Sequence, residues 1–298
     1  MTVKSAERTV RVTRMSSMKD LMRAVGDLSE PGIASLDLSH IEPGTQVSQS
    51  LMACLANHVA TESSKIGSIV LPGSGVALDR ARRAGFEVLG DLLGLHGDLA
   101  SPRQLGLRED DNPSELLPGG GLLFRHPHRY ASSDWRYAAT SIAAKASRAA
   151  SHVSVSGSSL VGTNRAVFEL AENLAHASLP VEGLSYVLVD VGDGTCSITS
   201  VDTGIGLLGS LARREPSALD DRVSALSRLF RGEYTYDSLR GRGLMALAGL
   251  AVELGGAVEC FTCEDRLSSS ALRYSDGRVE EITGIALQGT VVTVSLPH

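Results

Sequence analysis

The stretch from Phe168 to Asn173 places a carboxylate and an amide where they could act together on water and a cation. Apolar residues recur at helical spacing between positions 163 and 177, which predicts an amphipathic helix. Glu169 and Asn173 are one helical turn apart and therefore lie side by side. The carboxylate is a candidate base for activating water, and the amide oxygen is a suitable ligand for Mg2+. The alternative is that both residues only form the solvated face of the helix.

A second group of residues has the chemistry to bind a nucleobase. The apolar run 195–201 predicts a strand that ends at Asp202, with Gly204 and Gly206 just beyond it. A carboxylate at a strand end can accept a hydrogen bond from an exocyclic amine, and glycines allow a flat ring to approach the backbone. The alternative is an ordinary glycine-rich turn from strand to loop.

A third group has the chemistry to bind phosphate. A predicted helix over residues 245–254 is preceded by the sequence Gly241-Arg242-Gly243-Leu244. Glycines before a helix N-terminus leave amide donors open to an anion, which the helix dipole also favours. The alternative is a flexible loop before a buried helix. Further on, Gly289-Thr290 begins a strand of alternating Val and Thr, which by itself indicates no more than a strand start.

In this order, the four stretches resemble the nucleotide-binding motifs of the GHKL ATPases. That superfamily includes DNA gyrase, heat-shock chaperones of the ninety-kilodalton class, sensor histidine kinases and the serine kinases that act as anti-sigma factors. The resemblance covers the last half of the chain. It implies an ATP site in which Asn173 binds Mg2+, Asp202 accepts a hydrogen bond from the adenine amino group and Glu169 is the general base.

The same resemblance implies roles for the remaining candidate residues. Gly204 and Gly206 would shape the nucleotide pocket, and Thr290 would support the adenine end of that pocket, beside Asp202. The phosphates would be held by Gly241, Arg242, Gly243 and Leu244. Residues 207–239 are the expected lid, whose arginines are expected mostly to be solvated or paired locally.

The pattern of helices and strands predicted along the chain, which must position these residues, indicates an α/β protein of two domains. Residues 134–298 are expected to form a GHKL α/β sandwich, with helices on one face of a mixed sheet. Residues 1–96 alternate strands (9–13, 34–38, 66–71) with helices (18–25, 47–60, 75–84), which indicates a small α/β domain. This region resembles a degenerate STAS domain, the fold of anti-sigma factor antagonists. Residues 97–133, rich in Gly, Pro and charge, are expected to be a linker or an irregular segment.

Composition narrows the classes of partner. The 298 residues are 43% hydrophobic and 21% charged, which is ordinary for a globular protein, and the net charge is -6. A negative charge and a pI near 5.8 argue against broad nucleic-acid binding. No signal-like segment or membrane-spanning run is found in the sequence, so a cytoplasmic location is expected. The Cys260 and Cys263 pair and the His126 and His128 pair are expected to be reduced thiols and polar surface rather than metal sites.

The sequence therefore predicts an ATPase or an ATP-dependent serine/threonine phosphotransferase with a regulatory or signalling role. Its expected ligands are an adenine nucleotide and Mg2+. By analogy, a protein partner would bind the N-terminal domain and the protein could form a homodimer. The alternative is a nucleotide-gated interaction module, or a catalytically inactive scaffold with the same fold.

Overall fold

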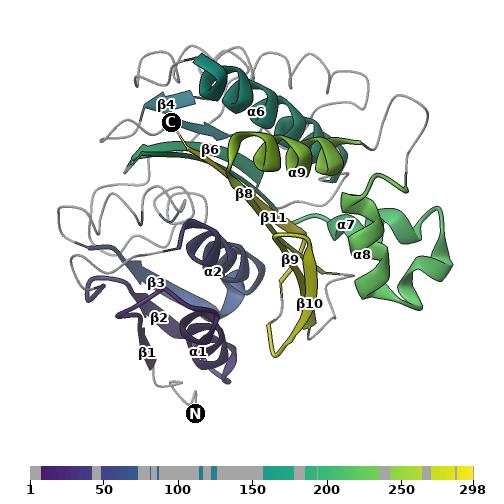
Figure 1. Cartoon of the computed structure of the whole chain (residues 1–298). Coiled ribbons are helices and arrows are strands. Elements are labelled where there is room, and N and C mark those ends of the chain that lie inside the picture. Colours follow the sequence, from purple (N-terminus) through teal and green to yellow (C-terminus); the bar gives the residue numbers. More distant parts are fainter. Residues whose placement is uncertain are drawn as a thin grey trace. The chain divides into compact units, whose positions relative to one another are not determined.

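A computed structural model of the chain describes residues 8–41, 48–72, 81, 86, 114–116, 122–125, 157–177, 185–192, 194–234, 242–263, 270–285 and 287–297. Its contacts divide the chain into two units, Met1–Asp111 and Asn112–His298. Both units combine helices with strands, one around a parallel sheet and the other around an antiparallel sheet (Figure 1). The predicted α/β class is therefore confirmed. No helix among the described residues is long and apolar enough to cross a bilayer.

The N-terminal unit is built on three parallel strands in the order β1-β2-β3. Its elements are β1 (Arg8–Arg11), α1 (Met18–Ser29), β2 (Ala34–Asp37), α2 (Gln49–Thr61), a 3-10 turn η1 (Ser63–Lys65) and β3 (Ile66–Val70). Helix α1 connects β1 to β2, and α2 lies between β2 and β3, as parallel pairing requires a crossover. The five expected elements up to residue 71 are present. The expected helix 75–84 and the stretch 42–47 lie largely or wholly outside the described residues.

Helix α1 shows how local sequence sets an element of this unit. Ser17 caps the helix and exchanges hydrogen bonds with Asp20 in a capping box, which satisfies the first backbone donors. Buried apolar residues then recur at helical spacing, namely Leu21, Ala24, Val25 and Leu28. Burial of this face, rather than helix propensity, is the main source of stability for a helix of this length.

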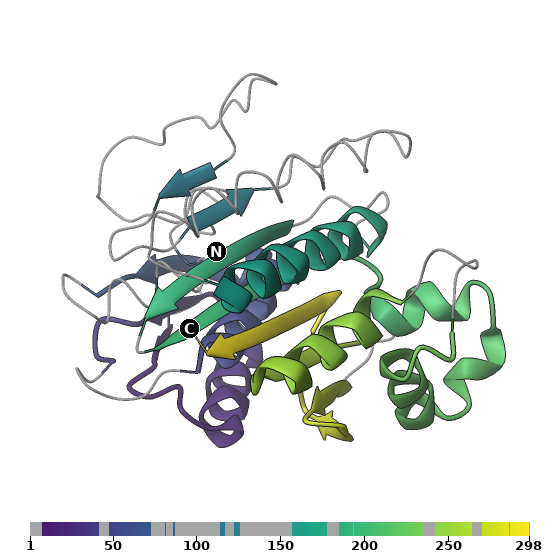
Figure 2. The same ribbon diagram turned by 45° about the horizontal axis from the view of Figure 1, so that its top comes forward.

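The second unit contains an eight-stranded sheet in the order β10-β9-β8-β11-β7-β6-β5-β4. Its elements are β4 (Ser114–Leu116), β5 (Leu122–Arg125), α6 (Gly157–Ala177), β6 (Ser185–Gly192), β7 (Thr195–Asp202), α7 (Gly206–Ala212), η2 (Pro216–Leu219), α8 (Arg222–Phe230), α9 (Gly243–Leu254), β8 (Ala257–Thr262), β9 (Ser270–Ser275), β10 (Arg278–Thr283) and β11 (Thr290–Pro297). Helices α6 and α9 lie along one face of this sheet in both views (Figures 1 and 2).

Two features of this sheet differ from expectation. Every pairing between its described strands is antiparallel, whereas a mixed sheet was expected. The reason is that short turns join β6 to β7 and β9 to β10, and β11 returns between β8 and β7, antiparallel to both. In addition, β4 and β5 lie within residues 97–133, where a linker or irregular segment was expected, and β5 pairs with β6.

Alternation along the strands places the core between the helices and the sheet. On β7, Cys196 and Ile198 belong to the apolar core, together with alternate residues of β11 such as Val292 and Val294. The intervening residues point to the opposite face, where the hydroxyls of Thr199 and Thr293 lie 3.1 Å apart. Because the side-chain period is two, Asp202 also points to the helix-covered face.

Candidate functional site

Three polar side chains meet at one end of the sheet, on the face that the helices cover. Asp202 is the last residue of β7 and is paired in register with Thr290, the first residue of β11. Thr290 is paired in turn with Thr262, the last residue of β8. The hydroxyls of Thr262 and Thr290 lie 3.4 Å apart. The antiparallel pairing therefore brings together residues up to 88 positions apart and places Thr290 beside Asp202.

Asp202 is a buried carboxyl with a strongly perturbed pKa. It is only 2% exposed, and its Oδ1 accepts a hydrogen bond of 2.9 Å from the backbone N–H of Gly204. The N–H and hydroxyl of Thr290 also donate to it. Burial raises the pKa of Asp202 from 3.8 to about 7, because the desolvation of the charged form outweighs these hydrogen bonds. Asp202 is thus poised to change its charge near neutral pH, as functional carboxyls often are.

The backbone of Gly289 approaches Asp202 too closely for Gly289 to carry a side chain. A Cβ on Gly289 would lie 2.1 Å from the carbonyl oxygen of Asp202 and 2.6 Å from its Oδ1, and Gly289 has a φ of 83°. Both the contact and the backbone conformation therefore require glycine at this position. Gly204 and Gly206 form the turn that leads from β7 into α7, with Gly206 as the first residue of the helix.

Two residues that sequence reasoning did not select hold this turn in place. The hydroxyl of Thr262 accepts a 2.9 Å hydrogen bond from the backbone N–H of Leu207, and the side chain of Gln288 donates a 2.7 Å bond to the carbonyl of Thr203. Gln288 precedes Gly289 and Thr262 ends an apolar strand, so each had a weak local signal. Only the strand order places them against the turn.

The second part of the site lies where α6 meets the beginning of α9. A Cβ added to Gly243 would lie 2.9 Å from Oε2 of Glu169 and 3.4 Å from Oδ1 of Asn173. The carboxylate and the amide predicted from helical spacing are therefore side by side, against the first turn of α9. The Nδ2 of Asn173 is buried without a hydrogen-bond partner. A buried amide donor without a partner is costly, which is typical of a group reserved for a ligand.

The other predicted phosphate-binding residues have different environments. Arg242 is the exposed N-cap residue of α9, and its side chain makes no capping hydrogen bond. Leu244 is 6% exposed and packs into the core, so only its backbone is available to a ligand. Gly241 lies outside the described residues.

The segment expected to be a lid is largely helical. Between residues 207 and 234, α7 contributes Leu208, η2 contributes Ala218, and α8 contributes Leu226 and Phe230 to the core. Two of its arginines pair locally, since Arg228 and Arg231 both bond Glu233, whereas Arg222 bonds the distant Glu281 of β10. The part of this segment between 235 and 239 lies outside the described residues.

All four cysteines are buried. No group of three or more potential metal-ligating His, Cys, Asp or Glu residues occurs in the described segments. Burial raises the pKa of the Cys260 thiol, which keeps it protonated. His126 and His128 lie outside the described residues.

Neither a known protein family nor a curated protein matches the sequence. The candidate site is therefore defined by its own geometry. It combines a buried carboxyl at the ends of three strands with a Glu and Asn pair against a helix N-terminus, all on the helix-covered side of one sheet. Chemically, the buried carboxyl can accept a hydrogen bond from the edge of a nucleobase or donate one to it. The Glu and Asn pair can orient water and offer an oxygen ligand to a cation.

Proposed function

We propose that the second unit binds Mg-ATP in the manner of the GHKL ATPases and turns it over, either by hydrolysis or by phosphoryl transfer to a protein hydroxyl. The observation that carries the proposal is the close approach of Gly243, at the first turn of α9, to both Glu169 and Asn173. Segments some 70 residues apart in sequence supply a base, a cation ligand and backbone donors within one small volume. That is the set of groups phosphoryl transfer needs.

The residues of the site fit Mg2+ and a nucleotide. Asn173 would hold the cation through its amide oxygen, and the unused Nδ2 has hydrogen-bonding capacity for a neighbouring ligand oxygen. Bound Mg2+ supplies positive charge that stabilises the phosphates. The amides at the start of α9, including that of Gly243, would donate to phosphate oxygens. Arg242 is exposed at the same helix end and adds a positive charge there.

Asp202 would bind the adenine. Its ionised form accepts a hydrogen bond from the exocyclic amine, and Thr290 and the Gly204 amide keep the carboxyl in place. Glu169 would orient or deprotonate a water molecule or a partner's hydroxyl. A scaffold without activity has no need of a carboxylate at this position, so Glu169 favours turnover.

Calorimetric titration with a non-hydrolysable ATP analogue and Mg2+, together with a phosphate-release assay, tests the proposal. Glu169→Gln is expected to preserve analogue binding and to lower turnover by about 10²-fold or more, the usual contribution of a general base. Asp202→Asn is expected to weaken analogue binding. Glu253→Gln is the matched control, because Glu253 is exposed on α9 outside the site.

Two outcomes would overturn parts of the proposal. Absence of analogue binding by the wild-type protein would refute the nucleotide site. Binding without any phosphate release or transfer would instead favour the nucleotide-gated interaction module. A regulatory protein of this kind would use its N-terminal unit, which resembles a STAS domain, to select a protein partner, and we propose that role for residues 1–111.

A further inference from the structure

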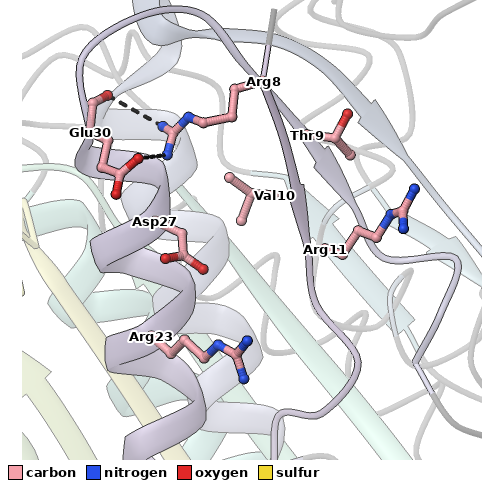
Figure 3. Close-up of a pocket in the computed structure, with 7 residues that line it drawn as sticks. All are labelled: Arg8, Thr9, Val10, Arg11, Arg23, Asp27 and Glu30. Carbon is pink, nitrogen blue, oxygen red and sulfur yellow. Dashed lines mark hydrogen bonds and ion pairs between the residues drawn. The ribbon is translucent and has the colours of Figure 1, made fainter.

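A groove in the N-terminal unit runs along the outer edge of β1. Its volume is about 450 Å3, and its lining residues are Arg8, Thr9, Val10 and Arg11 of β1 with Arg23, Asp27 and Glu30 of α1 and its C-cap (Figure 3). Successive side chains of a strand point to opposite faces, so a groove on one face contacts only every second residue. Because this groove contacts all four residues of β1, it follows the strand edge.

The backbone groups of β1 on that edge are directed into the groove. The N–H of Arg8 donates to the carbonyl of Ile33 (3.1 Å), and that of Val12 donates to the carbonyl of Asp37 (2.9 Å), so even-numbered residues bond to β2. The N–H and C=O groups of Thr9 and Arg11 must then point the other way. In the described part of the sheet, β1 is the terminal strand and pairs with β2 alone. An edge with outward donors and acceptors is a template for another strand.

Three arginines line the groove together with two carboxylates, Asp27 and Glu30, so its net charge is positive, and the charges are incompletely paired. Arg8 is held by Glu30 at 2.5 Å. Arg11 is 3.8 Å from Asp37, and its side chain is 68% exposed. Among the described residues no ion pair or hydrogen bond involves Arg23, which faces the groove from α1 (Figure 3). Two guanidinium groups are therefore available, one on each side of the strand edge.

This arrangement has consequences for the identity of the partner. Side chains of an added strand would alternate between the α1 side, where Arg23 lies, and the opposite side, where Arg11 lies. Adjacent acidic residues on that strand would meet both guanidinium groups. Pairing of β1 with β1 of a second copy would instead oppose arginines, and like charges across strands are destabilising. Charge complementarity therefore favours an acidic partner over self-association.

We propose that the free edge of β1 binds an extended acidic segment of a partner protein, which adds to the sheet as a further strand. Backbone hydrogen bonds to Thr9 and Arg11 supply the affinity, and Arg11 and Arg23 supply the preference for carboxylates. This inference deepens the partner role given to the N-terminal unit in the proposed function. It does not depend on nucleotide binding by the second unit.

Fluorescence anisotropy with the full chain tests the inference. The probe is a labelled Thr-rich peptide of about eight residues, long enough for one added strand, with a pair of adjacent Glu at its centre. Wild-type protein is expected to bind it, with weaker binding at high salt. A peptide with Lys in place of Glu, and one with an N-methylated backbone, are expected not to bind. Equal binding of the Lys peptide would overturn the acidic preference, and equal binding of the N-methylated peptide would overturn strand addition.

Matched protein variants separate the edge from general charge effects. Arg23→Glu is expected to weaken binding by about tenfold, since an attraction becomes a repulsion. Lys19→Glu makes the same charge change on an exposed position of α1 outside the groove and is expected to have little effect. Equal losses of peptide affinity in these two variants would refute the groove as the binding site. Thr9→Pro removes an outward N–H without breaking the β2 pairing, and it should abolish binding while the circular dichroism spectrum is retained.

Nucleotide measurements keep this inference distinct from the proposed function. Asp202→Asn is expected to weaken nucleotide binding and leave peptide binding unchanged, whereas Arg23→Glu is expected to weaken peptide binding and leave nucleotide binding unchanged. Failure of the acidic peptide to bind any form of the protein would refute the inference and leave the nucleotide site unaffected.

Discussion

Substitution of Asp202 by Asn should remove a pH dependence of stability that has one structural cause. The side chain is 2% exposed, and burial raises its pKa from 3.8 to about 7. In this interval the folded protein holds a proton on Asp202 that the unfolded chain has lost. Stability therefore falls as the pH rises through the interval and levels off above the folded pKa. Asn keeps an acceptor for the Gly204 amide but has no charge to bury.

The size of the effect follows from the two pKa values. At about 1.4 kcal/mol per pH unit, the interval between them corresponds to about 4 kcal/mol. Between about pH 5 and pH 8.5, the free energy of unfolding of the wild type should fall by about 3 kcal/mol relative to Asp202→Asn. The comparison between the two proteins cancels the contributions of other titrating groups. The measurement is urea unfolding followed by circular dichroism across this pH range.

A solvent-exposed carboxyl provides the control for this experiment. Asp220 is exposed at the end of η2, and Asp220→Asn should track the wild type at every pH. A wild-type curve parallel to that of Asp202→Asn would refute the argument that Asp202 is neutral below pH 7. If the proposed adenine contact forms, a saturating nucleotide should move the inflection to lower pH. The reason is that an amine that donates to the carboxyl favours its ionised form.

Three further substitutions test the local geometry. Gly289→Ala should destabilise the protein by about 3 kcal/mol, through a clash with Asp202 and an unfavourable φ. The control is Gly194→Ala, which should cost only about 1 kcal/mol, because φ is 72° there but the space around the residue is open. Equal shifts in the Tm of the two variants would contradict the clash. Asn173→Ala should leave the stability of the protein unchanged or raise it, because the substitution removes a buried donor without a partner. The same variant should lose the Mg2+ dependence of its affinity for the ATP analogue. A large loss of stability in thermal unfolding would show that the amide is structural. Thr262→Val should cost about 1 to 2 kcal/mol in urea unfolding, because the first turn of α7 loses its hydrogen-bond acceptor. An unchanged unfolding midpoint would show that this hydrogen bond does not stabilise the turn.

Local patterns in the sequence anticipated much of the fold. The five elements from β1 to β3, the helix carrying Glu169 and the strand ending at Asp202 all follow from apolar periodicity and turn residues. The strands β4 and β5 were not anticipated, because they are short and lie in a region rich in glycine, proline and charge. Such segments become strands through pairing with a neighbour, which local propensity does not report.

The candidate site divides in the same way. Helical spacing alone placed Glu169 beside Asn173, because one turn of helix fixes that relation whatever surrounds it. Their approach to Gly243 and the pairing of Asp202 with Thr290 depend on contacts between segments far apart in the chain. Thr262 and Gln288 entered the site only through strand order.

The sequence by itself thus determined the types of chemically active residue and the elements that carry them, since both depend on interactions within a few residues. Tertiary structure alone decided the antiparallel order of the strands, the burial that raises the pKa of Asp202 and the place of β1 at the edge of the described part of its sheet. These properties depend on which distant segments exclude water from a side chain or leave a backbone edge unpaired. No local pattern of residues encodes that information.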